Sequence, residues 1–570
     1  MRRLFRFHGG VHPPEHKLES SVLPSTRAPL PGVLLLPLQQ HIGATAKPLV
    51  QPGERVLKGQ VLARAEGNLS AAIHAPTSGT VQAIGPATVP HPSGMEDMCI
   101  TLVPDGADEW IAHAPIDYRA LSKDALLAKL RDGGIVGLGG ATFPTHVKFA
   151  AGPVQTLVIN GAECEPWITT DDRLMRERAA EIVQGIEILR HLVGPAETVV
   201  GIEDNKPEAI AAMQQACANT GIEVAVVPTL YPTGGEKQLI RILTGKEVPS
   251  GGRPFNIGVA CGNVATAYAV HRLVHHGEPM LSRLVTVTGA VKTPQNFEAL
   301  LGTPIAELVA AAGGALPDAQ GYILGGPMMG LHVDADSLPV VKGTNCIIVK
   351  SPALFPPQPL ALPCIRCTRC AQACPADLQP QDLYWFAKAR NFGKAQEYNL
   401  FDCIECGACA YVCPSHIPLV HYYRYAKGEI WAREKEKNAA DAARARHEFR
   451  IERMERDKRE KAEKLAQKEK ASRAAAEPAA AGTAASGTAA PAAAEPAQSA
   501  DAQAQVQAQT NAAAAMIAAA AERARQQAAQ VHPRNTENLS AQQQAEITEI
   551  ETRRAQIRKM AHHETESPKE

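Results

Sequence analysis

Eight of the thirteen cysteines fall in two short motifs, and this feature constrains the chain more than any other. The motifs are CIRCTRCAQACP at 364–375 and CIECGACAYVCP at 403–414, and both follow the spacing C-x2-C-x2-C-x3-C-P. Gaps of two residues let one turning loop direct several thiolates toward a common centre, but they are too tight for ordinary disulfides. The closing proline redirects the chain after the last cysteine. We therefore expect a metal-binding role and a reducing compartment.

The spacing is typical of chains that hold two [4Fe-4S] clusters, in which three close cysteines bind one cube and the fourth reaches the other cube. The predicted ligands are Cys364, Cys367, Cys370 and Cys413 for one cluster and Cys403, Cys406, Cys409 and Cys374 for the other. Structural zinc is the alternative, but zinc needs only four tetrahedral ligands, usually delivered as two separated pairs. The insert 376–402 reads as helical, which favours an α-helical ferredoxin domain. Two such clusters would conduct electrons one at a time.

Length and charge set broad limits on the rest of the chain. With 570 residues and 45% hydrophobic content, it is long enough for several domains of about 100 to 200 residues each. The 58 basic and 59 acidic residues nearly cancel, so charge does not favour a nucleic-acid partner. The best apolar runs, 32–38 and 512–521, fall short of the roughly 18 residues that suggest a spanning helix. The basic start meets glycines and prolines where a signal peptide needs an apolar stretch. We expect neither export nor a transmembrane helix in the chain itself.

The stretch 42–85 alternates apolar and polar positions between PG, KG and SG turns, which predicts a small all-β module. PGERVLKGQVLAR followed by HAPTSGTV resembles the biotinyl and lipoyl carrier domains, and this implies a barrel-sandwich hybrid fold. The carrier domains place a lysine on the hairpin between their halves, whereas this chain reads EGNLSAAI there. The missing lysine argues against a tethered cofactor.

Residues 120–260 alternate helical and strand-like segments, which predicts a mostly parallel α/β sheet. Within them, GIVGLGGATFPTHVKF at 134–149 places a glycine cluster at a strand-to-helix turn, where open backbone can donate N–H groups to a phosphate. By itself, such a cluster more often marks a plain tight turn. It is followed by NGAECEP at 160–166 and YPTGGEKQLI at 231–240.

In order and spacing these three motifs resemble the NADH-binding flavoprotein subunit of respiratory complex I. The resemblance implies that FMN is held non-covalently by the glycine loop and its lysine, at Gly137, Gly139, Gly140, Thr142 and Lys148. The family's other motifs, one of which lines the nicotinamide pocket, fall on Asn160, Glu163, Glu165, Tyr231, Gly234, Glu236, Asn263, Val264 and Thr266. Two positions depart from the family: Ala162 replaces an aspartate, and Gly235 stands where the first of two glutamates would be.

Electron counting connects these motifs with the cysteines. A nicotinamide exchanges two electrons together as hydride, whereas a cluster moves one at a time, so a flavin is expected between them.

The segment 281–314 reads as two strands, a turn and a helix, and it resembles the soluble-ligand-binding β-grasp module. After 425 the chain becomes a charged stretch with interleaved signs, which predicts a solvated helix.

Beyond about 474 the composition is dominated by Ala, Gln, Glu, Pro and Thr, which predicts a disordered tail, with a coiled coil as the alternative. The expected fold is therefore a multidomain α/β chain. Its predicted domains are a barrel-sandwich hybrid at 1–115, an FMN- and NADH-binding α/β domain at 116–275, a β-grasp at 276–350, an α-helical two-cluster ferredoxin domain at 355–428, a charged helix at 429–473 and a low-complexity tail at 474–570.

The order of these parts, with the opening GGVHPPEHK, closely resembles the C subunit of the Rnf (Rsx) complexes over about 1–425. The resemblance implies an NAD-linked oxidoreductase subunit of a translocase complex, peripheral on the cytoplasmic face of the bacterial inner membrane. It would exchange electrons between NAD(H), FMN, two [4Fe-4S] clusters and its partners, which include membrane subunits and a ferredoxin-like subunit. The A subunit of the sodium-pumping NADH:quinone reductase shares much of the layout, but that family lacks the twin cysteine motif. The other alternative is a soluble iron–sulfur electron-transfer adaptor with a non-catalytic flavin-like domain, and flavin content discriminates between the two.

Overall fold

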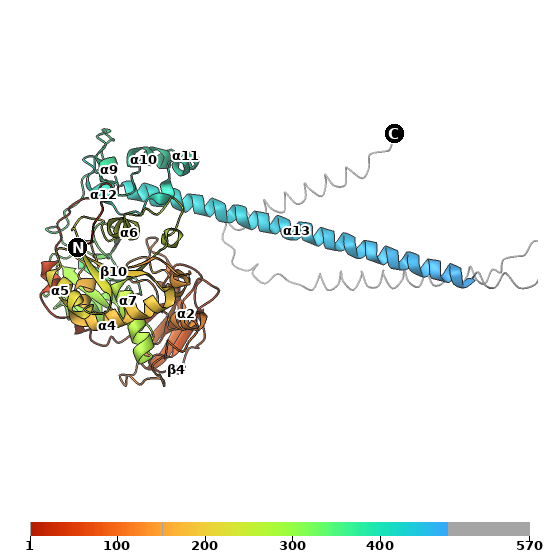
Figure 1. Ribbon diagram of the computed structural model, residues 1–570, viewed down its shortest axis with the longest axis horizontal. Helices are drawn as coiled ribbons and strands as arrows, with labels where there is room; N and C mark the ends of the chain where they lie inside the picture. The colour runs from red at the N-terminus through yellow and green to blue at the C-terminus, as the bar shows by residue number, and fades with distance from the viewer. Residues whose placement is uncertain (1, 151, 477–570) are drawn as a thin grey trace, which may run out of the picture. The chain divides into compact units, whose positions relative to one another are not determined.

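A computed structural model describes residues 2–150 and 152–476 of the chain. The predicted tail at 474–570 therefore lies outside the described residues except for its first three positions. Contacts divide the chain into one compact unit up to Glu452 and a second unit that begins at Arg453, and the description below concerns the first unit (Figure 1).

The N-terminal β module consists of two small antiparallel sheets that share one hydrophobic core, to which Leu36, Val56, Leu62 and Ile73 contribute. One sheet has the order β2-β8-β7-β4 and the other β3-β5-β6. The strands are β2 (Leu34–Pro37), β3 (Lys47–Pro48), β4 (Arg55–Val56), β5 (Val61–Arg64), β6 (Ile73–His74), β7 (Gly79–Thr88) and β8 (Glu96–Pro104). This arrangement agrees with the predicted all-β module.

The next layer is a parallel four-stranded sheet with the order β11-β10-β9-β12. Helices α4 and α7 pack against each other, and α6 buries Leu239 and Leu243 in a separate core with strand residues such as Val199. The elements are α2 (Lys123–Asp132), α3 (Thr145–Phe149), β9 (Thr156–Asn160), α4 (Thr170–Val193), β10 (Glu197–Glu203), α5 (Pro207–Ala216), β11 (Ile222–Val227), α6 (Glu236–Thr244), η1 (Pro254–Ile257), β12 (Val259–Asn263) and α7 (Val264–His276). In such a sheet, ligands bind beyond the carboxyl ends of the strands.

A six-stranded mixed sheet follows, with the order β1-β14-β13-β17-β15-β16. The strand pair and helix predicted over 281–314 are present as β13, β14 and α8. An N-terminal strand that the sequence did not reveal, β1, forms one edge beside β14. The elements are α1 (Leu18–Ser21), β1 (Thr26–Arg27), β13 (Ser282–Gly289), β14 (Gln295–Leu300), α8 (Ile305–Ala311), β15 (Tyr322–Leu324), β16 (Leu331–Val333) and β17 (Cys346–Val349).

The cysteine region is a cluster of short helices with a hydrophobic core of its own. Its elements are α9 (Arg369–Ala373), α10 (Pro380–Lys388), α11 (Phe392–Glu397), η2 (Leu400–Asp402), α12 (Ala408–Tyr411) and α13 (Leu419–Ala476). Helix α13 begins earlier than the predicted charged helix at 429–473, because Tyr423, Ala426 and Ile430 pack into that core. After this apolar turn, the described side chains of α13 are exposed, as the charged pattern predicts.

Candidate functional site

Two asparagines end neighbouring strands at the carboxyl edge of the parallel sheet, where Asn160 of β9 lies opposite Asn263 of β12. The Asn263 side chain caps α7, since its Oδ1 accepts from the N–H groups of Ala265 and Thr266 at 2.9 and 3.3 Å. Its amide donates to the Asn160 carbonyl at 3.3 Å. The Asn160 amide donates to the carbonyl of Gly234 at 2.8 Å. Residues from three of the predicted motifs therefore meet at this edge.

The glycine loop closes over the same edge. The Gly137 N–H donates to the Phe143 carbonyl at 2.8 Å, and the Leu138 N–H donates to Thr266 Oγ1 at 2.9 Å. Gly139 and Gly140 are exposed, and a Cβ built on Gly140 would meet nothing within 4 Å. Gly140 has φ of +120°, a conformation that a residue with a side chain rarely adopts. The loop thus presents unobstructed backbone, which fits the approach of an FMN phosphate.

The remaining two residues of the predicted flavin set lie at either end of the loop. Thr142 adopts φ of +47° and lies against Gly343. Lys148 forms an ion pair with Glu236, at 2.6 Å between Nζ and Oε1, and both side chains are about one-third exposed. Burial alone would lower the pKa of Lys148, but the Glu236 charge outweighs it and raises the pKa. A protonated amine is therefore held at the loop, as phosphate binding requires.

Glu163, predicted for the nucleotide pocket, has both carboxylate oxygens occupied by helix α4. Oε1 accepts from Thr170 Oγ1 at 3.1 Å and from the Asp171 N–H at 2.6 Å, and Oε2 accepts from the Asp172 N–H at 3.1 Å. Burial raises the pKa of Glu163, whereas the charge of Lys17 opposes the rise. The carboxylate satisfies otherwise unpaired N–H groups at the start of the helix. This capping role was not visible in the sequence.

Glu165 is enclosed by the glycine-rich turn between β15 and β16. This turn belongs to the layer of the six-stranded mixed sheet, called the β-grasp layer below. Its Oε1 accepts from the N–H groups of Met328 and Met329 at 2.8 and 3.1 Å. A Cβ at Gly326 would overlap the Glu165 side chain, so the turn needs glycine at that position. Burial raises the pKa of Glu165, while the two N–H donors counteract the rise. The turn at 325–330 therefore holds the second glutamate of the motif in place.

Lys17, in the N-terminal segment, stabilises the loop at 160–168 that contains both glutamates. The sequence did not predict this role. The ammonium of this half-buried residue donates to the carbonyls of Glu163, Glu165 and Ile168 at 2.7, 2.9 and 2.7 Å. No carboxylate lies within 4 Å of it in the part of the chain that the structure describes. The neighbouring His16 ring stacks on Trp167, with centroids 4.1 Å apart. The only signal was the GGVHPPEHK segment, which contains this lysine.

Four cluster cysteines come together in the ferredoxin region. Cys374 of the first motif and Cys403, Cys406 and Cys409 of the second line one small cavity with Tyr423. Burial raises the pKa of Cys403, Cys406 and Cys409, and the Cys374 thiol adds to the rise at each of them. Four cysteines from two motifs therefore line one cavity, which fits the second predicted [4Fe-4S] cluster. Lys427 donates to the Cys403 carbonyl at 2.7 Å and supplies a nearby positive charge.

The other predicted set is nearer the surface. Cys367 is exposed, and Cys364, Cys370 and Cys413 are half-buried at the edge of the ferredoxin core. The Arg366 N–H donates to Cys364 Sγ at 3.4 Å. In the described ranges, no three His, Cys, Asp or Glu side chains lie close enough to ligate a single metal ion. The ligand assignments of both clusters remain predictions.

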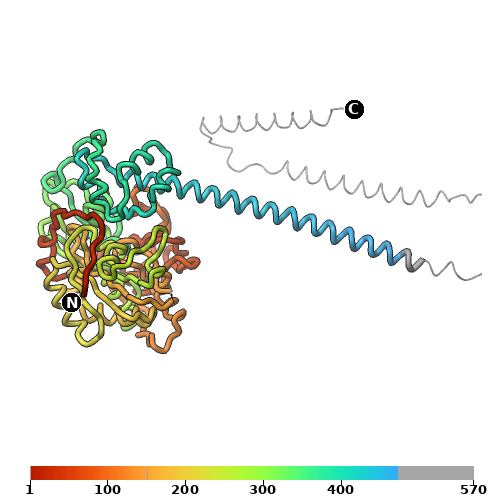
Figure 2. The backbone as a smooth tube through the Cα atoms, turned by 45° about the horizontal axis from the view of Figure 1, so that its top comes forward, coloured from red at the N-terminus to blue at the C-terminus, as the bar shows by residue number. Residues whose placement is uncertain are grey.

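The flavin-type layer and the cysteine region meet directly at Tyr231. The Tyr231 hydroxyl donates to the Cys406 carbonyl at 2.6 Å, and its backbone pairs with Val11. The N-terminal segment also contacts the other motif, since the Gly10 N–H donates to the Ala373 carbonyl at 3.1 Å and His8 lies 2.8 Å from the Cys374 carbonyl. Figure 2 shows this segment in red running beside the teal cysteine region. Tyr231, one of the predicted cofactor-binding residues, joins the parallel-sheet layer to the cysteine region.

Comparison with known protein families covers most of the described chain. The family models that match are the RnfC barrel sandwich hybrid domain over 5–107, the Nuo51 FMN-binding domain over 130–272, the SLBB domain over 284–332 and the 4Fe-4S dicluster domain over 363–417. The matches confirm the predicted multidomain α/β layout, the FMN-binding domain and the pair of [4Fe-4S] clusters, and they set structural zinc aside.

Similar whole proteins carry one shared description, the C subunit of an ion-translocating oxidoreductase complex. The protein from Serratia proteamaculans is 46% identical, over 83% of this chain and 67% of that protein. The protein from Yersinia pseudotuberculosis serotype O:3 is 49% identical, over 70% of this chain but only 58% of that protein. The chain thus spans about three fifths to two thirds of these relatives. Among solved structures, an air-oxidized NAD+-reducing [NiFe]-hydrogenase is 20% identical over 51% of this chain and 60% of its own, with a TM-score of 0.39.

Proposed function

The chain belongs to the family of C subunits of ion-translocating oxidoreductase complexes, and we propose that it passes electrons between NAD(H), FMN and two [4Fe-4S] clusters to other subunits of such a complex. The observation that carries the proposal is the contact between the two redox regions. The Asn160 amide donates a hydrogen bond to the Gly234 carbonyl. Three residues before Gly234, the Tyr231 hydroxyl donates a hydrogen bond to the Cys406 carbonyl. The segment 231–234 thus connects the loop that follows β9 with the second cysteine motif.

Each cofactor is assigned to its own residues. When bound, FMN supplies the exchange between hydride transfer and single-electron transfer. The open backbone at Gly139 and Gly140 and the charge of Lys148 would hold its phosphate, while Asn160 and Asn263 orient the loop around it. NAD(H) would bind at the same strand edge, on a loop that Glu163 and Glu165 brace from inside. The eight motif cysteines would hold the two clusters, with Cys374 and Cys413 exchanged between the motifs.

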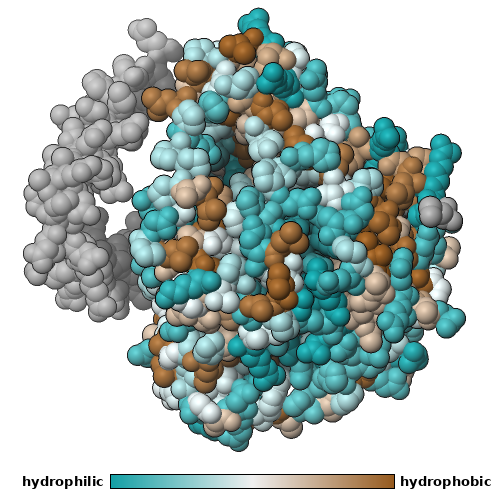
Figure 3. Space-filling view, turned by 90° about the vertical axis from the view of Figure 1, so that its left-hand side faces the viewer, coloured by the Kyte–Doolittle hydropathy of each residue, from teal (hydrophilic) through white to brown (hydrophobic). Residues whose placement is uncertain are grey.

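Membership in the family supports the proposed partners and location. We place the chain as a peripheral subunit on the cytoplasmic face of the bacterial inner membrane, where its electron partners would be membrane subunits and a ferredoxin-like subunit. Among the described helices, none is both long and apolar enough to cross a bilayer. Apolar side chains gather in separate small patches on the face in Figure 3. Leu360, Leu362 and Ile365, next to the first cysteine motif, are exposed and would suit a partner contact.

Anaerobic preparation of the full chain tests the proposal. We expect bound FMN and about eight irons per chain, with NADH bleaching the flavin absorbance before the clusters are reduced. Gly139→Val should remove the flavin and leave the iron in place, because the added side chain would lie against Asn263 and obstruct the loop. Gly32→Val is the matched control, since a Cβ there meets nothing within 4 Å. Protein with full iron that takes up no added FMN would overturn the proposal and favour the soluble adaptor.

A further inference from the structure

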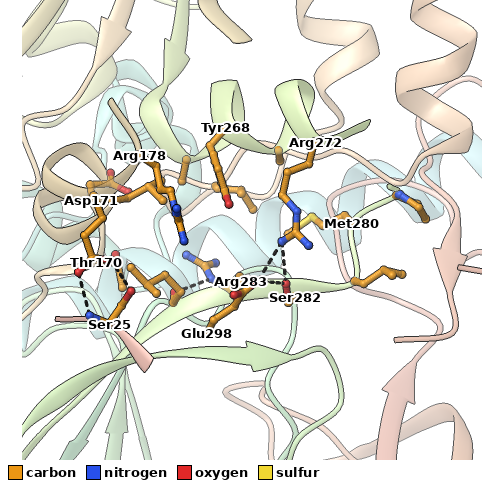
Figure 4. Close-up of a pocket in the computed structure, with 18 residues that line it drawn as sticks. Ser25, Thr170, Asp171, Arg178, Tyr268, Arg272, Met280, Ser282, Arg283 and Glu298 are labelled. Carbon is orange, nitrogen blue, oxygen red and sulfur yellow. Dashed lines mark hydrogen bonds and ion pairs between the residues drawn. The ribbon is translucent and has the colours of Figure 1, made fainter. Parts of the chain in front are cut away.

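A cavity of about 60 Å³ lies between helices α4 and α7 on one side and strands β13 and β14 on the other (Figure 4). One water needs about 10–15 Å³ of such volume, so the cavity has room for several waters or one small polar ligand. None of the fourteen residues named above for FMN or NAD(H) lines it. The cavity borders the glycine loop through Leu138 and the capped start of α4 through Asp171, but it is not formed by the predicted cofactor contacts.

A buried guanidinium faces this cavity without a carboxylate partner. Arg283 is only 6% exposed, and its donors meet the carbonyls of Leu284, at 3.3 Å, and Lys342. No carboxylate of the described residues lies within 4 Å of it. Burial lowers the pKa of Arg283 to about 10, and the more distant Asp171 charge opposes the drop. An unpaired buried charge is costly, so a ligand that supplies the opposite charge is favoured.

Two further donors point at the same space. In Figure 4, Arg178, Tyr268 and Arg283 converge from α4, α7 and β13. The Tyr268 hydroxyl makes no hydrogen bond to any residue the structure describes. Arg178 sits where α4 departs from helical geometry, and its nearest acidic group is Glu181 at 3.8 Å on the exposed surface. Three donors from three elements therefore face one cavity.

The acidic residues that line the cavity are largely neutralised by other partners. Glu298 pairs with Arg272 at 3.0 Å and accepts from Ser282 at 2.8 Å. Glu177 pairs with Arg173 and accepts two hydrogen bonds from Ser25. Asp171 accepts from the Asn263 amide at 2.7 Å, and burial raises its pKa. Among the arginines that line the cavity, Arg283 has no carboxylate within 4 Å among the described residues, and Arg178 has only the 3.8 Å contact with Glu181, whereas Arg272 is paired at 2.8 and 3.0 Å.

We propose that this cavity binds a small oxyanion, a phosphate or a carboxylate group, through Arg178, Arg283 and the Tyr268 hydroxyl. Guanidinium groups bind both oxyanions through paired, charge-assisted N–H donors, and the phenol adds one more donor. The ligand would be held between the parallel-sheet layer and the β-grasp layer, because Arg283 comes from β13 and the other two donors come from α4 and α7.

Calorimetric titration of the flavin-loaded full chain tests this site, because bound FMN keeps the flavin phosphate site filled. The probes are inorganic phosphate and succinate in a buffer free of other oxyanions. We expect saturable binding of at least one probe, and the one that binds identifies the group. Arg178→Gln should weaken binding about five-fold and Arg283→Lys about ten-fold, since each removes a charge-assisted contact or its fork geometry.

The control is Arg190→Gln, which changes an arginine of the same helix that pairs with Glu187 and does not line the cavity. Its affinity for the probe should match that of the wild type. If Arg283→Lys does not fold, the affinity of Arg178→Gln relative to the wild type tests the proposal by itself, because Arg178 is half-exposed. Absence of saturable binding of both anions, or equal affinity in the wild type and Arg178→Gln, would overturn the proposal.

Discussion

The cavity lined by Cys374 and the three cysteines of the second motif and the loop at 160–168 reach their geometry in different ways. The cavity takes its four thiols from two twelve-residue motifs whose spacing already turns the chain toward a centre. The loop at 160–168 is held by Lys17, which is 146 to 151 residues away, and by a glycine-rich turn more than 160 residues away. Spacing therefore predicts ligands that lie near one another in sequence, but it does not reveal supports that arrive from remote segments.

The largest expected effect tests the crossed ligation of the cavity. Cys374→Ala should reduce the iron content from about eight to about four and abolish the EPR signal of the cluster held by Cys403, Cys406 and Cys409. Cys217→Ala, at a buried cysteine outside both motifs, should retain all the iron. Loss of the other cluster's signal in Cys374→Ala would mean that the ligand sets are not crossed.

The next test concerns the remote support of the loop. Lys17→Met should destabilise the protein by about 1 to 3 kcal/mol, because three partly buried carbonyls lose a charged donor. We expect a lower Tm together with weaker FMN binding, while the iron content stays unchanged. Lys47→Met, at an exposed lysine, should alter neither quantity. Unchanged FMN affinity in Lys17→Met would show that the loop is positioned without this clamp.

A third test measures how stability depends on pH through Lys342, another residue that connects segments distant in sequence. The buried Lys342 donates to the carbonyls of Ala72 and Gly134 at 2.8 and 2.7 Å, and burial lowers its pKa from 10.5 to about 7. Between these values the unfolded chain binds more protons than the folded chain, so stability rises with pH by up to about 1.4 kcal/mol per unit.

The Tm of the wild type should therefore rise relative to that of Lys342→Met between pH 6.5 and pH 9. Lys129→Met, at an exposed lysine of α2, should follow the wild type throughout. Parallel profiles for the wild type and Lys342→Met would mean that Lys342 does not change its protonation in this range.

The smallest expected effect lies where the two regions meet. Tyr231→Phe removes the donor to the Cys406 carbonyl, which should cost about 1 kcal/mol and leave the iron content unchanged. The midpoint potential of the second cluster should shift, because a hydrogen bond beside a ligand cysteine is lost. Tyr322→Phe, at a tyrosine of the β-grasp layer, should leave that potential unchanged. An unaltered potential in Tyr231→Phe would mean that the contact is only structural.

Much of the fold was predictable from periodicity. The strands and helices expected over 120–260 and 281–314 are present, because each has an apolar face that matches its own period. The start of α13 at Leu419 and the edge strand β1 were not predicted. Both depend on partners distant in sequence, since Tyr423 packs into the ferredoxin core and Thr26 pairs with Phe297.

For the candidate site, the sequence by itself determined the residue types and their spacing: thiols at repeated intervals, a glycine loop with its lysine, and two strand-ending asparagines. The tertiary structure decided which polar groups remain available. It assigned Glu163 to the start of α4 and Glu165 to the turn around Gly326, and it joined Tyr231 to Cys406. The physical reason is that buried donors and acceptors must be paired, and their partners come from whichever segments the fold brings together.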